Sequence, residues 1–218
     1  MTHDMIAFQR RQERASPREG RNGKLHALTA LCALGLAAAA HAQTTSESAD
    51  VVGQGLGGAV VAADGASLRR SDNGLTVSLR MPTPSPGSYM YPGPSMFQPE
   101  GAYPGQPEAY SFWVFVFNTP QDCAESACTI AEFFAGVGTG GAFNAGGHIV
   151  GGPNLQLSGH LTLNSTPFLG SPILNPTTAE VHLAVAPHGA LQPAVLPEQI
   201  TTPIGTPAHW WLALFLID

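Results

Sequence analysis

Three segments of the chain alternate apolar and polar residues, which is typical of half-buried β-strands. Residues 75–81, 155–163 and 179–185 carry an apolar side chain at every second position except Gly159, and a period of two places these side chains on one face of a strand. The inward positions are Leu75, Val77, Leu79, Met81, Leu155, Leu157, Leu161, Leu163, Val181, Leu183 and Val185. The outward positions include His160, Glu180 and His182.

Two further segments, residues 110–117 and 210–217, are apolar on both faces and rich in aromatic residues. Such runs predict central strands that are covered on both sides. Residues 129–134 are expected to return as the hairpin partner of the first of them. Turn residues separate the strands, and no amphipathic helix is evident. The pattern therefore predicts an all-β fold, a single antiparallel β-sandwich or barrel-like domain.

Two segments lack periodicity. Residues 82–107 contain eight prolines and three tyrosines; because proline lacks the N–H that a strand ladder needs, a long Pro/Gly/Tyr-rich loop is expected. Residues 43–58 are small, polar and rich in glycine, which predicts a flexible N-terminus for the mature protein. The β domain is then expected to span residues 59–218.

The apolar run at residues 25–40 follows a basic segment and ends in Ala40-His41-Ala42. This order is typical of a secretory signal peptide with a long basic n-region, cleaved after Ala42. The run is shorter than the roughly 20 apolar residues that span a bilayer. Residues 1–42 are therefore predicted to be removed. The mature protein would be secreted or periplasmic, with no membrane span.

Cleavage changes the charge balance of the chain. Six of the nine Lys and Arg residues and three of the fifteen acidic residues precede residue 43, which leaves three basic side chains against twelve acidic ones. Such an acidic domain is a poor polyanion binder, so nucleic acid and anionic lipid are not expected as partners. The expected partner is an extracytoplasmic ligand or protein that the sequence does not identify.

Cys123 and Cys128 are the two cysteines that remain after cleavage, and they allow two local structures. An oxidising compartment favours a disulfide between them. Asp122 and Glu125 instead form a capping-box pattern for a helix, on which the cysteines would lie about 8 Å apart. A disulfide needs Cα atoms within about 7 Å, so the two structures exclude each other. The disulfide is the favoured interpretation.

Histidines on the outward faces of the strands raise the question of a metal site. If the strands that carry His160 and His182 are neighbours, both imidazoles stand beside Glu180, and His188 follows close by, with His148 as a further candidate. Imidazole and carboxylate groups suit Zn²⁺ or Cu²⁺. No local His pair supports the site, however, and the alternative is a set of polar residues on a solvated sheet face.

Catalytic and cofactor motifs are weak in this chain. There is no G-x-S-x-G segment, and no Ser-Asp-His set stands out. Two G-x-G-x-x-G matches, beginning at Gly53 and Gly136, are not followed by the helix that dinucleotide binding needs. We therefore expect no catalytic residue, no cofactor and no enzymatic activity.

Part of the chain resembles a group of uncharacterised exported bacterial β proteins, which are distantly similar to chordin-type (CHRD) modules. The matching segments are FWVFVFN at residues 112–118, AGGHIVG at 145–151 and AEVHLAVAPHG at 179–189. The resemblance implies a single exported domain and transfers no catalytic residue. The sequence thus predicts an exported, non-enzymatic binding or structural β domain. The alternative is an extracytoplasmic Zn/Cu-binding protein that uses His160, His182 and His188.

Overall fold

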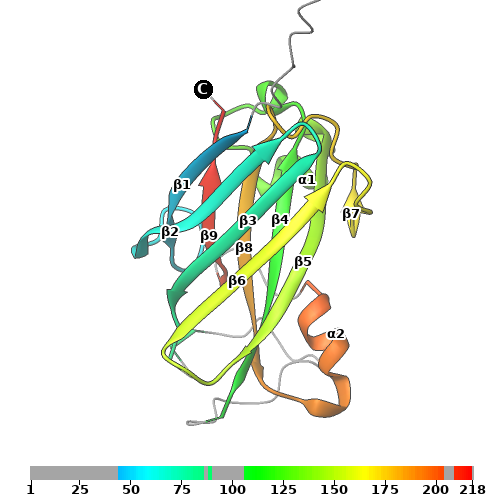
Figure 1. The fold of residues 1–218 in the computed structure, drawn as a ribbon. Helices are drawn as coiled ribbons and strands as arrows, with labels where there is room; N and C mark the ends of the chain where they lie inside the picture. The colour runs from blue at the N-terminus through cyan, green and yellow to red at the C-terminus, as the bar shows by residue number, and fades with distance from the viewer. Residues whose placement is uncertain (1–43, 86–87, 90–105, 204–208, 218) are drawn as a thin grey trace, which may run out of the picture. The chain divides into compact units, whose positions relative to one another are not determined.

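The computed structural model describes residues 44–85, 88–89, 106–203 and 209–217. Their backbone forms one nine-stranded antiparallel sheet in the order β6-β3-β2-β1-β9-β8-β4-β5-β7 (Figure 1). The strands are β1 (Thr45–Val52), β2 (Val60–Ser71), β3 (Gly74–Pro82), β4 (Glu108–Phe117), β5 (Gly140–Val150), β6 (Asn154–Thr162), β7 (Leu169–Gly170), β8 (Glu180–Ala190) and β9 (Trp211–Phe215). The predicted signal peptide and most of the predicted loop at residues 82–107 lie outside the described residues.

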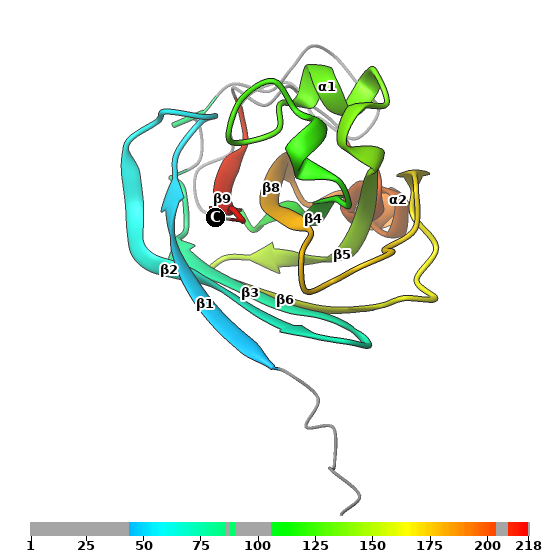
Figure 2. The ribbon, with the colours of Figure 1, turned by 90° about the horizontal axis from the view of Figure 1, so that it is seen from above.

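The sheet curls on itself into a half-barrel (Figure 2). Strands β1, β2, β3 and β6 form one wall, and β9, β8, β4 and β5 form the facing wall. The two walls also approach each other where β5 meets β6. Gly159 of β6 lies so close to β5 that a Cβ added to it would be only 2.7 Å from the Cβ of Ala145. The expected all-β, barrel-like domain is confirmed.

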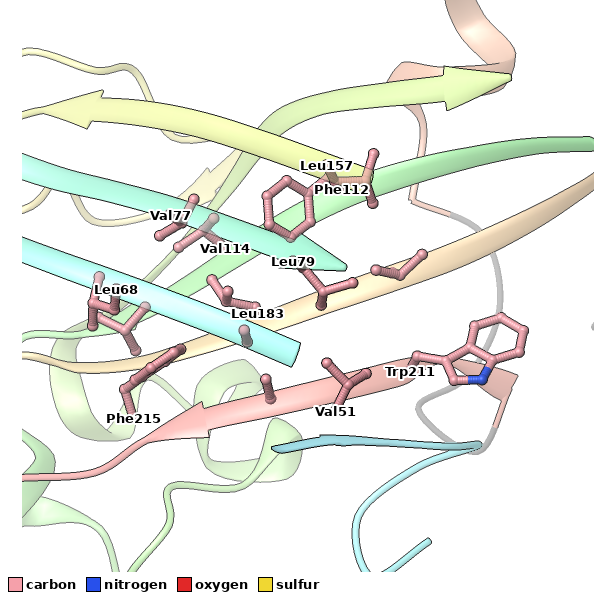
Figure 3. Packing of buried hydrophobic residues seen from close by; sticks show 14 of the residues in the cluster. Val51, Leu68, Val77, Leu79, Phe112, Val114, Leu157, Leu183, Trp211 and Phe215 are labelled. Carbon is pink, nitrogen blue, oxygen red and sulfur yellow. The ribbon is translucent and has the colours of Figure 1, made fainter. Parts of the chain in front are cut away.

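The predicted alternation holds on the concave side of the sheet. Side chains from both walls interdigitate there, as Figure 3 shows for Leu79, Phe112 and Leu183. The inward residues of β3 and β8 are all buried, as are Leu155, Leu157 and Leu161 of β6. Leu163 lies beyond the end of β6 and is 37% exposed. This enclosed layer is the main hydrophobic core.

Strands β4 and β8 are buried on both faces, as residues 110–117 predicted for β4. Every residue of β8 is buried, and only Phe115 of β4 is partly exposed. Their convex face is covered by short elements: α1 (Ile130–Phe134), α2 (Leu196–Thr201), η1 (Pro120–Asp122), η2 (Val137–Thr139) and η3 (Pro193–Val195). Two smaller apolar clusters lie on that face: one around Trp113, with Trp210 and Leu212, and one around Phe133 of α1.

The predicted hairpin partner of β4 was wrong. Residues 129–134 were expected to form it, but Ile130–Phe134 is the helix α1, and β5 pairs with β4 instead. Thr129 and Glu132 form a reciprocal capping box that starts α1, and this local signal outweighs the strand propensity of the Ile and Phe residues. Glycines conceal β5 in the sequence, since they give no alternating pattern.

The N-terminal boundary also differs from the prediction. Residues 43–58 were expected to be flexible, with the domain starting at residue 59, but β1 lies between β2 and β9 inside the sheet. Its ladder with β2 runs from the Thr45–Arg70 pair to the Val52–Val60 pair. Hydrogen bonds of the backbone hold this polar strand in the sheet, since Val51 is the one side chain of β1 that is fully buried.

Arg70 closes one end of the main core. The residue is 1% exposed, and its Nε donates to Glu47 of β1 at 2.6 Å. Nη1 donates to the carbonyl oxygens of Pro176 and Ala179 in the turn before β8. A buried guanidinium requires such partners. This contact therefore links β1 and β2 to the start of the facing wall.

Candidate functional site

An apolar pocket lies on the convex face of the sheet, where β4, β8 and β9 run side by side. We call it the outer pocket. Its floor consists of side chains that alternate with the inward core residues: Trp113, Phe115 and Phe117 of β4, His182 of β8 and Leu212 of β9. The same period of two that fills the core therefore also supplies this aromatic floor.

The walls of the outer pocket come from segments that cover the sheet. Phe133 of α1 contacts Phe115 edge-on, with ring centroids 5.5 Å apart, and Phe168 contacts Trp113 in the same way at 5.3 Å. The rim is unusually apolar for a surface, since Phe134 is 71%, Phe168 59% and Leu56 53% exposed. The cavity has a volume of about 390 Å³. Ligand pockets are of this size and are mostly lined by such side chains.

A hydrogen-bonded carboxylate–imidazole pair is the polar feature of the outer pocket. Nε2 of His182 lies 2.6 Å from Oε1 of Glu180, and the same oxygen accepts the backbone N–H of Cys128 at 2.7 Å. Glu180 is 3% and His182 8% exposed. The imidazole packs on Phe117 with ring centroids 5.1 Å apart. The carboxylate is thus buried behind the imidazole, and His182 is the member that lines the pocket.

The disulfide between Cys123 and Cys128 is confirmed, with Cα atoms 5.4 Å apart. It occurs in the loop between β4 and α1 and excludes the alternative helix at Asp122. Cys128 Sγ lines the outer pocket, while the amide of the same residue bonds to Glu180. The next residue, Thr129, caps α1. The disulfide therefore holds the loop that places both α1 and the amide donor over β8.

The predicted histidines do not come together. His160 is exposed on β6, where its Nδ1 lies 3.0 Å from Oγ1 of Thr76, and β6 is at the far end of the sheet order from β8. His182 and His188 share the convex face of β8 but are six residues apart, which is about 20 Å along a strand. His148 is exposed on β5.

The order of the strands keeps His160 away from His182, because the metal hypothesis required β6 and β8 to be neighbours and they are not. No three His, Cys, Asp or Glu side chains within residues 44–85, 88–89, 106–203 and 209–217 form a group that could hold a metal ion. Glu180 and His182 do point outward, as predicted, but they are covered rather than solvated.

In the described part of the chain, no helix has the length and apolar character needed to cross a bilayer.

His188 belongs to a buried polar network outside the pocket. Its Nε2 lies 2.7 Å from Oγ of Ser111, and that oxygen also accepts the indole N–H of Trp113. Nδ1 of His188 is buried without a hydrogen-bond partner among the described residues. Gln199 of α2 donates to the carbonyl oxygen of His188 at 3.2 Å. Desolvation by burial lowers the pKa of His188 to about 4, so its imidazole is neutral near pH 7.

Sequence reasoning missed the outer pocket. The aromatic residues of β4 predicted only a strand covered on both sides, and Phe133 was assigned to a strand of the sheet and not to its cover. The Thr129–Glu132 capping box was the available signal for α1. No signal in the sequence indicates that Phe168 would lie beside Trp113.

Comparisons with known proteins identify no relative. No protein-family model matches the chain, and neither a curated protein nor a solved structure is significantly similar to it. The site therefore has to be interpreted from its own chemistry.

The buried imidazole of His188 predicts acid-sensitive stability. In the unfolded chain it binds a proton below about pH 6.5, whereas in the folded protein it does so only below about pH 4. The unfolded state therefore binds more protons in this interval, and the free energy of unfolding falls as pH decreases from about 6.5 to about 4. The contribution is on the order of 3 kcal/mol.

Urea unfolding at pH 7.5, 6, 5 and 4.5 measures this dependence. In the variant His188→Gln, which retains a hydrogen-bonding group for Ser111, the free energy of unfolding is expected to change less with pH than in the wild type. His160→Gln removes an exposed imidazole and is the matched control, expected to keep the wild-type slope. If the free energy of unfolding depends on pH equally in the wild type and in His188→Gln, His188 is not the cause of the acid sensitivity.

Proposed function

We propose that this protein is an exported, non-enzymatic binding domain that takes a small, mostly apolar molecule in the outer pocket. The observation that carries the proposal is the cavity of about 390 Å³ between the aromatic floor of β4 and the covering residues of α1. Apolar rings around a preformed cavity bind a ligand by removing its surface from water. The exposed rim, with Phe134 and Phe168, extends the area that a ligand can cover.

The chemistry of the lining supports binding rather than catalysis. Among the described residues that line the outer pocket, none carries a hydroxyl group, and Cys128 is in a disulfide. His182 has a carboxylate partner, as a general base often does, but the described residues that line the pocket include no nucleophile for it to activate. The pair is accordingly interpreted as a means of orienting a bound molecule.

Export is supported by the sequence of the leader and by the chemistry of the domain. The apolar run before Ala42 has the features of a signal peptide. A disulfide persists in an oxidising compartment.

A fluorescence titration tests the pocket. The neutral probe N-phenyl-1-naphthylamine, which fluoresces strongly in apolar surroundings, is expected to bind the wild type. Ala142 is 5% exposed and lines the cavity, so Ala142→Phe should fill it and weaken binding about tenfold or more. Val60→Phe adds the same side chain at an exposed position of β2 outside the pocket and should leave affinity unchanged.

Because an added ring can disturb packing, Phe134→Ser gives a second measure. Phe134 is 71% exposed at the rim, so its loss should reduce affinity without changing the thermal midpoint. The absence of probe binding to a folded wild type would contradict the proposal. Equal affinity of Ala142→Phe, Phe134→Ser and the control Val60→Phe for the probe would also contradict it.

Intact-mass spectrometry tests export. When the full chain is expressed in a bacterial host, the protein recovered outside the cytoplasm is expected to begin at Gln43. Ala42→Arg places a large charged residue at the cleavage site and should leave the precursor uncut. A cytoplasmic protein that retains residues 1–42 would contradict this part of the proposal.

A further inference from the structure

We infer that the ligand of the outer pocket is a neutral apolar molecule with one hydroxyl group, as in a phenol, and that this hydroxyl donates a hydrogen bond to Nδ1 of His182. The inference rests on the proposed function, because it names the class of ligand for the same pocket. Three features carry it: the hydrogen bonding of His182, the charges around the pocket, and the size of the cavity.

The hydrogen bonds determine which nitrogen of His182 carries the proton. Oε1 of Glu180 already accepts the amide N–H of Cys128, and it lies 2.6 Å from Nε2 of His182. An ionised carboxylate only accepts hydrogen bonds, so Nε2 must be the donor. In a neutral imidazole the other nitrogen, Nδ1, then carries a lone pair.

The hydrogen bond of His182 to a described residue is made by Nε2, and Nδ1 is not one of the fully buried atoms without a partner, so it stays accessible from the pocket. The residue is 8% exposed and lines the pocket. A polar atom in apolar surroundings gains most from a partner that the ligand supplies. The partner that matches a lone pair is a donor such as a hydroxyl group.

The charges around the pocket favour a neutral molecule. The described residues that line it include no Lys or Arg, and the described arginines, Arg69, Arg70 and Arg80, belong to β2 and β3. An anionic ligand would therefore bind near the carboxylate of Glu180, behind the imidazole, with no Lys or Arg among the described lining residues to offset the repulsion. A cation would not reach that carboxylate directly, because Glu180 is 3% exposed and already bonds to His182 and Cys128.

The size of the cavity limits the apolar part of the ligand. An apolar cavity of ~150 Å³ accommodates benzene, and the outer pocket has about 390 Å³. One or two aromatic rings therefore fit. The floor of Trp113, Phe115 and Phe117 offers edges and faces for ring contacts.

Isothermal titration calorimetry with a matched pair of ligands tests the inference. The two molecules are 2-naphthol and 2-methylnaphthalene, which differ by a hydroxyl in place of a methyl group. The wild type is expected to bind 2-naphthol about five- to tenfold more tightly, the ratio that one net hydrogen bond gives. His182→Phe should remove this preference while it still binds 2-methylnaphthalene, and His160→Phe, the control on β6, should retain it.

The outcomes separate this inference from the proposed function. If neither ligand binds the wild type, the proposed function fails together with the inference. If both ligands bind with equal affinity, or if His182→Phe keeps the preference for 2-naphthol, only the inference is overturned. Tighter binding of 2-naphthoate or phenyltrimethylammonium than of 2-naphthol would also overturn it, by showing that the site prefers a charged ligand.

Discussion

Burial of β4 and β8 on both faces is the constraint on which the rest of the structure depends. Curling of the sheet encloses only the concave face, where Phe112 and Leu183 lie in the main core. The convex face carries large apolar residues such as Trp113 and Phe115, which must also be removed from water. Short segments supply that cover, with α2 near His188 and α1 near Phe117. The outer pocket lies between α1 and the segments that carry Leu56, Phe168 and Pro203, which meet the sheet at separate places.

Glu180 connects the cover to the sheet. Its buried carboxylate needs hydrogen-bond donors, and it receives one from the backbone of Cys128 and one from the ring of His182. The disulfide to Cys123 limits the positions available to Cys128. The interaction therefore holds α1 over the floor of the outer pocket and also fixes the orientation of the imidazole that lines it.

The sequence predicted the elements whose signal is local and missed those that depend on distant partners. Residues 75–81, 110–117 and 179–185 were identified as strands because their apolar residues repeat with the period of a strand. Strands β1 and β5 were not predicted, because their polar residues and glycines give no such repeat. They are held in the sheet by backbone pairing with neighbouring strands. His182 was correctly assigned to the outward face. That this face is covered follows from α1 and Phe168, whose positions depend on tertiary packing.

The central claim is that the cover over β4 and β8 leaves a cavity that a ligand can enter. Crystals of residues 43–218, held under xenon pressure, test it most directly, because xenon occupies apolar cavities. The account predicts a xenon atom in the outer pocket, against the ring of Phe115 and within contact distance of His182. A structure in which the protein's own side chains fill this space, with no xenon on the convex face, would contradict it.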